Sequence, residues 1–62
     1  MENIEKNVGS VELTSEDGLL IWRKIYDDGT NGDWERTGIS TADRNGLIRL
    51  KEELEEKYGQ IN

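Results

Sequence analysis

The sequence predicts an α+β fold in which a three-stranded antiparallel sheet is followed by one C-terminal helix. Two extended segments rich in apolar residues flank Asp17-Gly18, a dipeptide that favours tight hairpin turns. A cluster of Asp, Asn and Gly residues then separates the second segment from a third. Near the end of the chain, Leu47, Leu50 and Leu54 recur at helical spacing.

The strands are expected at residues 8–14, 19–26 and 34–39. In the first, Val11 and Leu13 alternate with polar residues and should share one face. The second is apolar on both faces, but one helix covers only one face of a sheet. The other face is therefore expected to meet a partner, a ligand or a second subunit. The two faces of this strand carry Leu19, Ile21 and Ile25 on one side and Leu20, Trp22 and Tyr26 on the other.

The helix is expected at residues 42–58. Ser40 or Thr41 is the predicted N-cap, and Ser40 and Asp43 have the spacing of a capping box. Gly59 is the predicted C-cap, because glycine adopts the left-handed conformation that ends helices. A stripe on one side of the helix is expected to form the core or a dimer contact. Its residues are Leu47, Leu50, Leu54 and Tyr58.

The chain length of 62 residues indicates a single domain, expected at residues 8–62 after a flexible N-terminus at residues 1–7. A domain this small has marginal stability, and without cysteine it has no disulfide to support it. Association into a homodimer is therefore expected. No segment has the apolar character of a signal peptide or a membrane span, which predicts a cytoplasmic protein.

The formal net charge is −6, from 14 acidic and 8 basic residues, and such a field repels nucleic acid and attracts basic proteins. No nucleophile–base pair or glycine-rich phosphate loop is present, so no enzymatic activity and no cofactor are expected. The Asp-rich turn that starts at Asp27 departs from a calcium-binding loop. Gly38 stands where such a loop needs a bidentate glutamate, so no metal site is expected.

The acidity favours the hypothesis of a DNA mimic, which inhibits a basic DNA-binding protein by occupying its DNA-binding surface. Duplex DNA carries about one charge per 1.7 Å of axis, and a homodimer of acidic chains can present a comparable array of carboxylates. The binding would be a fast, salt-sensitive protein–protein interaction. The predicted partner-binding residues are Asp27, Asp28, Asp33, Glu35, Glu52, Glu53, Glu55 and Glu56.

Three short motifs point to a different partner. Residues 20–26, 36–40 and 50–52 resemble the aliphatic-x-Arg strand, the basic-x-Gly-Ile-Ser strand and the helix of positive-cofactor-four-type transcriptional coactivators. The resemblance implies a homodimer that binds single-stranded DNA on its strands. Thr41 departs from the family pattern, which has a hydrophobic residue there, and the net charge opposes phosphate binding. The resemblance carries the nucleic-acid-binding role over to Arg23, Lys24, Trp34 and Arg36.

The length, the acidity, the absence of cysteine and the Glu-rich segment 52–56 are similar to those of small acidic host-takeover proteins of phages. One of these proteins is a Bacillus-phage inhibitor of the nucleoid protein HU. The resemblance implies a nucleoid-associated protein such as HU as the partner and the host cytoplasm as the location. A third possibility is an interaction module without any connection to nucleic acid, in which the charge serves solubility.

Overall fold

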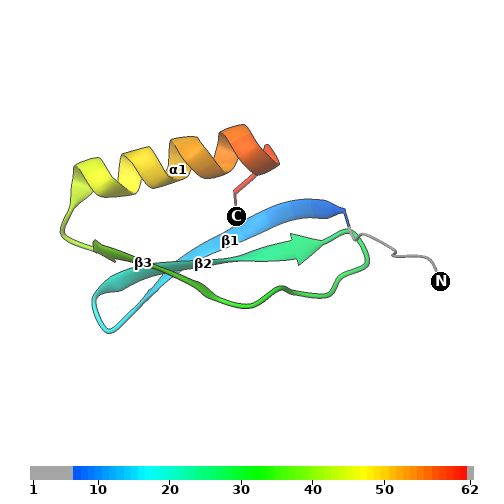
Figure 1. Ribbon diagram of the computed structural model, residues 1–62, viewed down its shortest axis with the longest axis horizontal. Coiled ribbons are helices and arrows are strands. Elements are labelled where there is room, and N and C mark those ends of the chain that lie inside the picture. The colour runs from blue at the N-terminus through cyan, green and yellow to red at the C-terminus, as the bar shows by residue number, and fades with distance from the viewer. Residues whose placement is uncertain (1–6, 62) are drawn as a thin grey trace.

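The computed structural model describes residues 7–61, which form a sheet with one helix packed across it (Figure 1). The strands are β1 (Val8–Glu16), β2 (Leu19–Tyr26) and β3 (Glu35–Ser40), and the helix is α1 (Arg44–Tyr58). The sheet is antiparallel in the order β1-β2-β3, which confirms the predicted fold class. Residues 1–6 of the predicted flexible segment and residue 62 of the predicted domain lie outside the described residues.

The β1–β2 connection is a tight hairpin at Asp17-Gly18, as predicted. Both residues have positive φ, 53° for Asp17 and 78° for Gly18, which is the requirement of a type I′ turn. The strands pair up to the turn, where Glu16 lies opposite Leu19, so β1 extends past the predicted end at residue 14. The same register places Glu12 opposite Arg23.

The β2–β3 connection, residues 27–34, is held by backbone hydrogen bonds. The N–H of Tyr26 donates to the carbonyl of Thr30 at 2.8 Å, and that of Gly32 donates to the carbonyl of Lys24 at 2.8 Å. Further along, Gly38 has a φ of 72° and the pairing of β2 with β3 shifts register. The Thr37 hydroxyl donates to a β2 carbonyl at 2.8 Å and so supports the pairing at this irregularity.

The start of α1 differs from the prediction, because its N-cap is Asp43 and not Ser40 or Thr41. The Asp43 carboxylate accepts a hydrogen bond from the N–H of Gly46 at 2.9 Å. The Ser40 hydroxyl accepts from the N–H of Ala42 at 3.1 Å, so it stabilises the turn before the helix. At the other end, Gly59 is the C-cap as predicted, with φ of 83° and its N–H donating to Glu55.

The hydrophobic core lies between α1 and one face of the sheet. Val11 and Leu20 from the sheet are buried against Leu50 and Leu54 of α1. Leu47 and Tyr58 pack at the edge of this cluster, so the predicted helical stripe is part of the core. After α1 the chain returns to β1, where the N–H of Val11 donates to the carbonyl of Gln60 at 3.0 Å.

Candidate functional site

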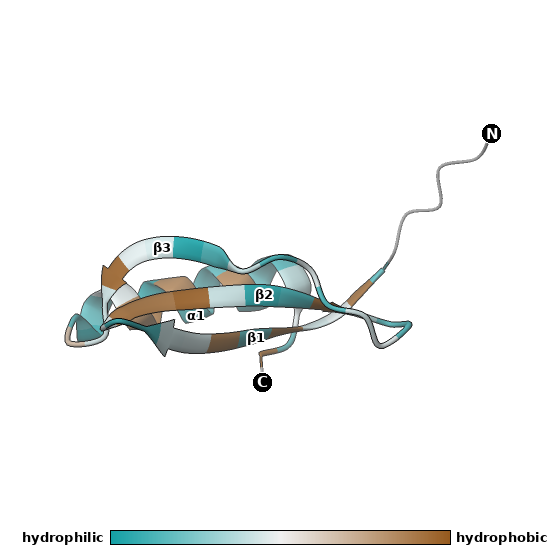
Figure 2. Cartoon of the chain, turned by 90° about the horizontal axis from the view of Figure 1, so that it is seen from below, coloured by the Kyte–Doolittle hydropathy of each residue, from teal (hydrophilic) through white to brown (hydrophobic). Residues whose placement is uncertain are grey.

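The face of the sheet opposite α1 is called the helix-free face below, and Figure 2 looks onto it with the helix behind the strands. Side chains alternate between the two faces along a strand. Because Leu20 and Trp22 of β2 pack in the core, the residues before and after each of them in the sequence point to the helix-free face. The helix-free face is formed by Glu12, Thr14, Glu16, Leu19, Ile21, Arg23, Ile25, Trp34 and Arg36.

An apolar strip follows the start of β2 on this face. Ile21 is only 7% exposed, although it is outside the cluster under α1, and it lies between Thr14 of β1 and Arg36 of β3. Leu19 is 44% exposed and Trp34 is 40% exposed. The prediction that β2 is apolar on both faces is therefore confirmed, and α1 covers one of them.

Arg23 and Trp34 are stacked on the helix-free face. The central carbon of the Arg23 guanidinium lies 4.5 Å from the centroid of the Trp34 ring, within the range of a cation–π interaction. The Nε of Arg23 also donates to Oε1 of Glu12 at 2.7 Å. Because this contact comes from the neighbouring strand, the guanidinium is held from two sides.

Arg36 lies on the same face and is held more loosely. Its Nη2 is 3.8 Å from Oε1 of Glu16, and the two side chains are 84% and 58% exposed. Exposed ion pairs of this kind contribute about 0–1 kcal/mol. The guanidinium of Arg36 is therefore accessible to a ligand.

Lys24, the fourth predicted nucleic-acid-binding residue, lies on the opposite face. It is paired with Val11 of the core, and its Nζ lies 5.8 Å from the centroid of the Tyr58 ring. The structure thus brings three of the four predicted residues together and separates Lys24 from them.

The predicted acidic residues are all exposed but occupy two separate segments. One segment, residues 27–35, is called the acidic loop below, and it contains four carboxylates and no basic residue. The other is α1, where the four glutamates are interspersed with Arg44, Arg49, Lys51 and Lys57, so the formal charge of the helix is zero. Within residues 7–61, none of these four glutamates forms an ion pair.

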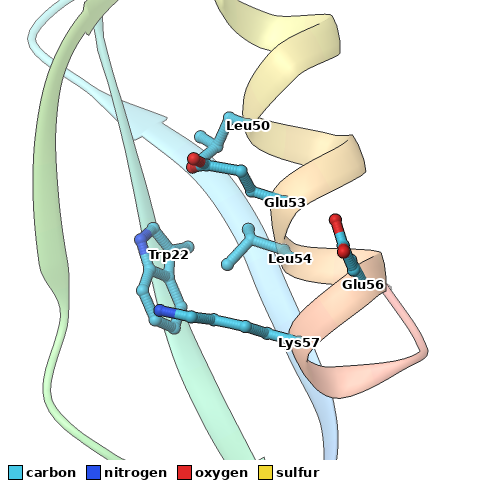
Figure 3. A pocket seen from close by; sticks show the side chains of 6 residues that line it. All are labelled: Trp22, Leu50, Glu53, Leu54, Glu56 and Lys57. Carbon is cyan, nitrogen blue, oxygen red and sulfur yellow. The ribbon is translucent and has the colours of Figure 1, made fainter.

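A groove of about 520 Å³, called the helix groove below, lies beside α1 on the covered face (Figure 3). In Figure 3, the side chain of Lys57 extends from the helix toward the Trp22 ring. Trp22 also packs against Tyr58, with the ring centroids 5.8 Å apart. The helix groove is lined by Trp22, Leu50, Glu53, Leu54, Glu56 and Lys57.

Sequence reasoning did not identify Glu12 and Glu16 as members of the site. The pairing of Glu12 with Arg23 is predictable from the sequence, because a two-residue turn at Asp17-Gly18 places residue 12 opposite residue 23. The pairing of Glu16 with Arg36 depends on the β2–β3 register, which the irregular connection and Gly38 determine.

Comparisons with family models, with curated proteins and with solved structures found no match to this chain. Among residues 7–61, no group of three or more acidic residues is placed to hold a metal ion. The helix in this part of the chain is too short and too polar to cross a membrane.

Proposed function

We propose that this protein binds single-stranded nucleic acid on the helix-free face of its sheet. The observation that carries the proposal is the stacked pair of Arg23 and Trp34, with the Arg36 guanidinium accessible on the same face. Unpaired bases stack on aromatic rings and on guanidinium planes, and each stacked base contributes about 1–3 kcal/mol. The proposed role is binding without catalysis, in the cytoplasm.

The charge of the protein determines how the proposed binding should depend on salt. Counterion release gives affinity when cations neutralise phosphates, but Arg23 and Arg36 each lie beside a carboxylate. The helix-free face is therefore close to neutral, with Glu12 and Glu16 balancing its two cations, while the excess of carboxylates lies elsewhere. We expect binding to depend mainly on base stacking and only weakly on salt.

We further propose that the protein works as a homodimer. Its few buried side chains give a small core, and a chain of this size gains stability by association. Two copies would present two helix-free faces to one strand and raise the effective affinity. Sedimentation equilibrium over a range of protein concentrations measures the stoichiometry.

The proposal is tested by titrating the protein with a single-stranded oligonucleotide at low salt. We expect quenching of tryptophan fluorescence, and a loss of about 5- to 150-fold in affinity in Trp34→Ala, which corresponds to one lost base stack. Trp22→Phe is the matched control, because Trp22 lies on the covered face. Equal affinities of Trp34→Ala and the wild type would overturn the proposal.

A second candidate function is the DNA mimic that inhibits a basic DNA-binding protein, with a nucleoid protein such as HU as the type of partner. It is supported by the acidic loop, which places four exposed acidic side chains in one short segment of the sequence without a basic residue. Here the loop, more than the helix, would imitate phosphates, since the glutamates of α1 are interspersed with cations.

The two candidates are separated by a displacement experiment. A mimic releases labelled duplex DNA from a basic nucleoid protein without itself binding the oligonucleotide. We expect amide substitutions in the acidic loop (Asp27→Asn, Asp28→Asn, Asp33→Asn and Glu35→Gln together) to abolish this release. The equivalent set in α1 (Glu52→Gln, Glu53→Gln, Glu55→Gln and Glu56→Gln) would have a smaller effect. Release that survives both sets would exclude mimicry by these carboxylates.

A further inference from the structure

We propose that Glu12 is a positioning residue, which holds the Arg23 guanidinium in its stack on Trp34 and keeps it from binding phosphate. The inference rests on the proposed binding of single strands and specifies how the site recognises them. Glu12 itself contacts no ligand. Glu12 instead determines how the Arg23 guanidinium is oriented and how far its charge is compensated.

The position of Glu12 is set by the β1–β2 hairpin. Because the two-residue turn pairs residue 12 with residue 23, the carboxylate lies directly across the strands from the guanidinium. The short distance of 2.7 Å between Glu12 Oε1 and Arg23 Nε is that of a charge-assisted hydrogen bond. The side chains of Arg23 and Glu12 are 27% and 37% exposed, so water screens this pair less than a fully exposed one.

The consequence for Arg23 is geometric as well as electrostatic. Its Nε–H is occupied by Glu12, and the central carbon of its guanidinium lies over the Trp34 ring, 4.5 Å from the ring centroid. The plane is thereby held in a fixed orientation, and its charge is compensated by the carboxylate. A guanidinium fixed in this way offers a flat surface to a base and little net charge to a phosphate.

Arg36 provides the contrast on the same face. Its contact with Glu16 is 3.8 Å long, and its side chain is 84% exposed, so it is free to turn toward a phosphate. The helix-free face therefore divides the two tasks between its two arginines. Arg23 with Trp34 contacts bases, and Arg36 contacts the backbone of the strand.

This division predicts the salt dependence of binding. Each phosphate that a protein neutralises on a single strand adds about 0.7 to the slope of log affinity against log salt. With Arg36 as the one phosphate contact, the wild-type slope should be about 0.7 or less per site. Glu12→Gln frees the charge of Arg23 and should steepen this slope by about 0.7.

The test compares three variants that change the net charge equally, Glu12→Gln, Glu16→Gln and Glu56→Gln, with the wild type. Affinity for a fluorescent thymidine oligonucleotide is measured by anisotropy at several salt concentrations. We expect the steeper slope in Glu12→Gln and a smaller change in Glu16→Gln. Glu56→Gln, on α1, should keep the wild-type slope. Glu12→Asp retains the carboxylate, so its slope of log affinity against log salt should be closer to that of the wild type than the slope of Glu12→Gln is.

A measurement without nucleic acid tests the same contact. In a Trp22→Phe background, Trp34 is the one tryptophan left, and its emission is excited at wavelengths that tyrosine does not absorb. Iodide quenches a tryptophan more strongly beside an uncompensated cation. We expect stronger iodide quenching in Glu12→Gln than in Glu56→Gln.

The outcomes are distinguishable. A wild-type protein that binds no oligonucleotide would overturn the proposed function, and the role of Glu12 with it. A wild-type protein that binds, with equal slopes in Glu12→Gln and Glu56→Gln, would overturn the role of Glu12 alone.

Discussion

The two faces of the sheet are formed by the same strands but are stabilised differently. Under α1, Val11 and Leu20 pack against leucines of the helix and are almost completely removed from water. On the helix-free face, Trp34 stays partly exposed and is held by a cation–π contact with Arg23. Apolar burial gives stability without a preference for any ligand, whereas exposed aromatic and guanidinium groups are available for binding. The covered face thus supports the fold and the helix-free face is suited to recognition.

The largest expected effect is a loss of stability on the covered face. Leu54→Ala should lower the free energy of unfolding by about 2–5 kcal/mol, because it leaves a cavity in a buried site. Leu19→Ala, on the helix-free face, should change it by less than about 1 kcal/mol. Urea denaturation followed by circular dichroism measures both variants. Similar losses of stability in the two variants would mean that side chains on the two faces contribute equally to the free energy of unfolding.

The next effect is on binding and uses neighbouring residues on opposite faces. Arg23→Ala should weaken oligonucleotide binding by about 2- to 30-fold. It removes the contact between the guanidinium and a base, and a cation–π contact of this kind contributes about 0.5–2 kcal/mol. Lys24→Ala removes the same charge from the covered face, where Lys24 lies near Tyr58, and should change the affinity much less. Anisotropy titrations at one salt concentration compare the two variants. An equal loss in both would indicate a response to net charge alone.

The smallest effect concerns the start of the helix. Asp43→Ala removes the N-cap hydrogen bond to Gly46 and should cost about 1 kcal/mol of stability. Because α1 does not touch the helix-free face, oligonucleotide affinity should be unchanged under conditions where the protein stays folded. Ser40→Ala is the control, and thermal unfolding should show a smaller loss for it. A larger loss in Ser40→Ala would favour the predicted N-cap over the one observed.

Local patterns predicted much of the fold. The alternation in β2, the turn at Asp17-Gly18 and the leucine stripe of α1 were each readable from a few neighbouring residues. The N-cap was not, because Ser40, Thr41 and Asp43 are all good capping residues. The chain still has to turn after β3, and the hydrogen bond from the N–H of Asp43 to the carbonyl of Ser40 closes that turn before the helix begins.

The candidate site was predictable only in part. The resemblance identified Arg23, Trp34 and Arg36, but it grouped Lys24 with them although Lys24 points to the other face. Alternation along β2 separates residues 23 and 24, so this separation was available from the sequence. The contact of Trp34 with Arg23 was not predictable from the sequence, because it depends on the path of the connection between β2 and β3.

By itself, the sequence determined the order of the elements, the two apolar faces of β2 and the pairing of Glu12 with Arg23. These features depend on strand periodicity and on a two-residue turn, which act over short distances along the chain. The tertiary structure alone decided which apolar face α1 covers and which residues of β3 and of the β2–β3 connection meet β2 on the other face. Both faces are apolar enough to receive a helix, so the choice depends on how the leucines of α1 pack against Val11 and Leu20. The register shift near Gly38 then determines how β3 meets β2 and which residues of the two strands lie together on the helix-free face.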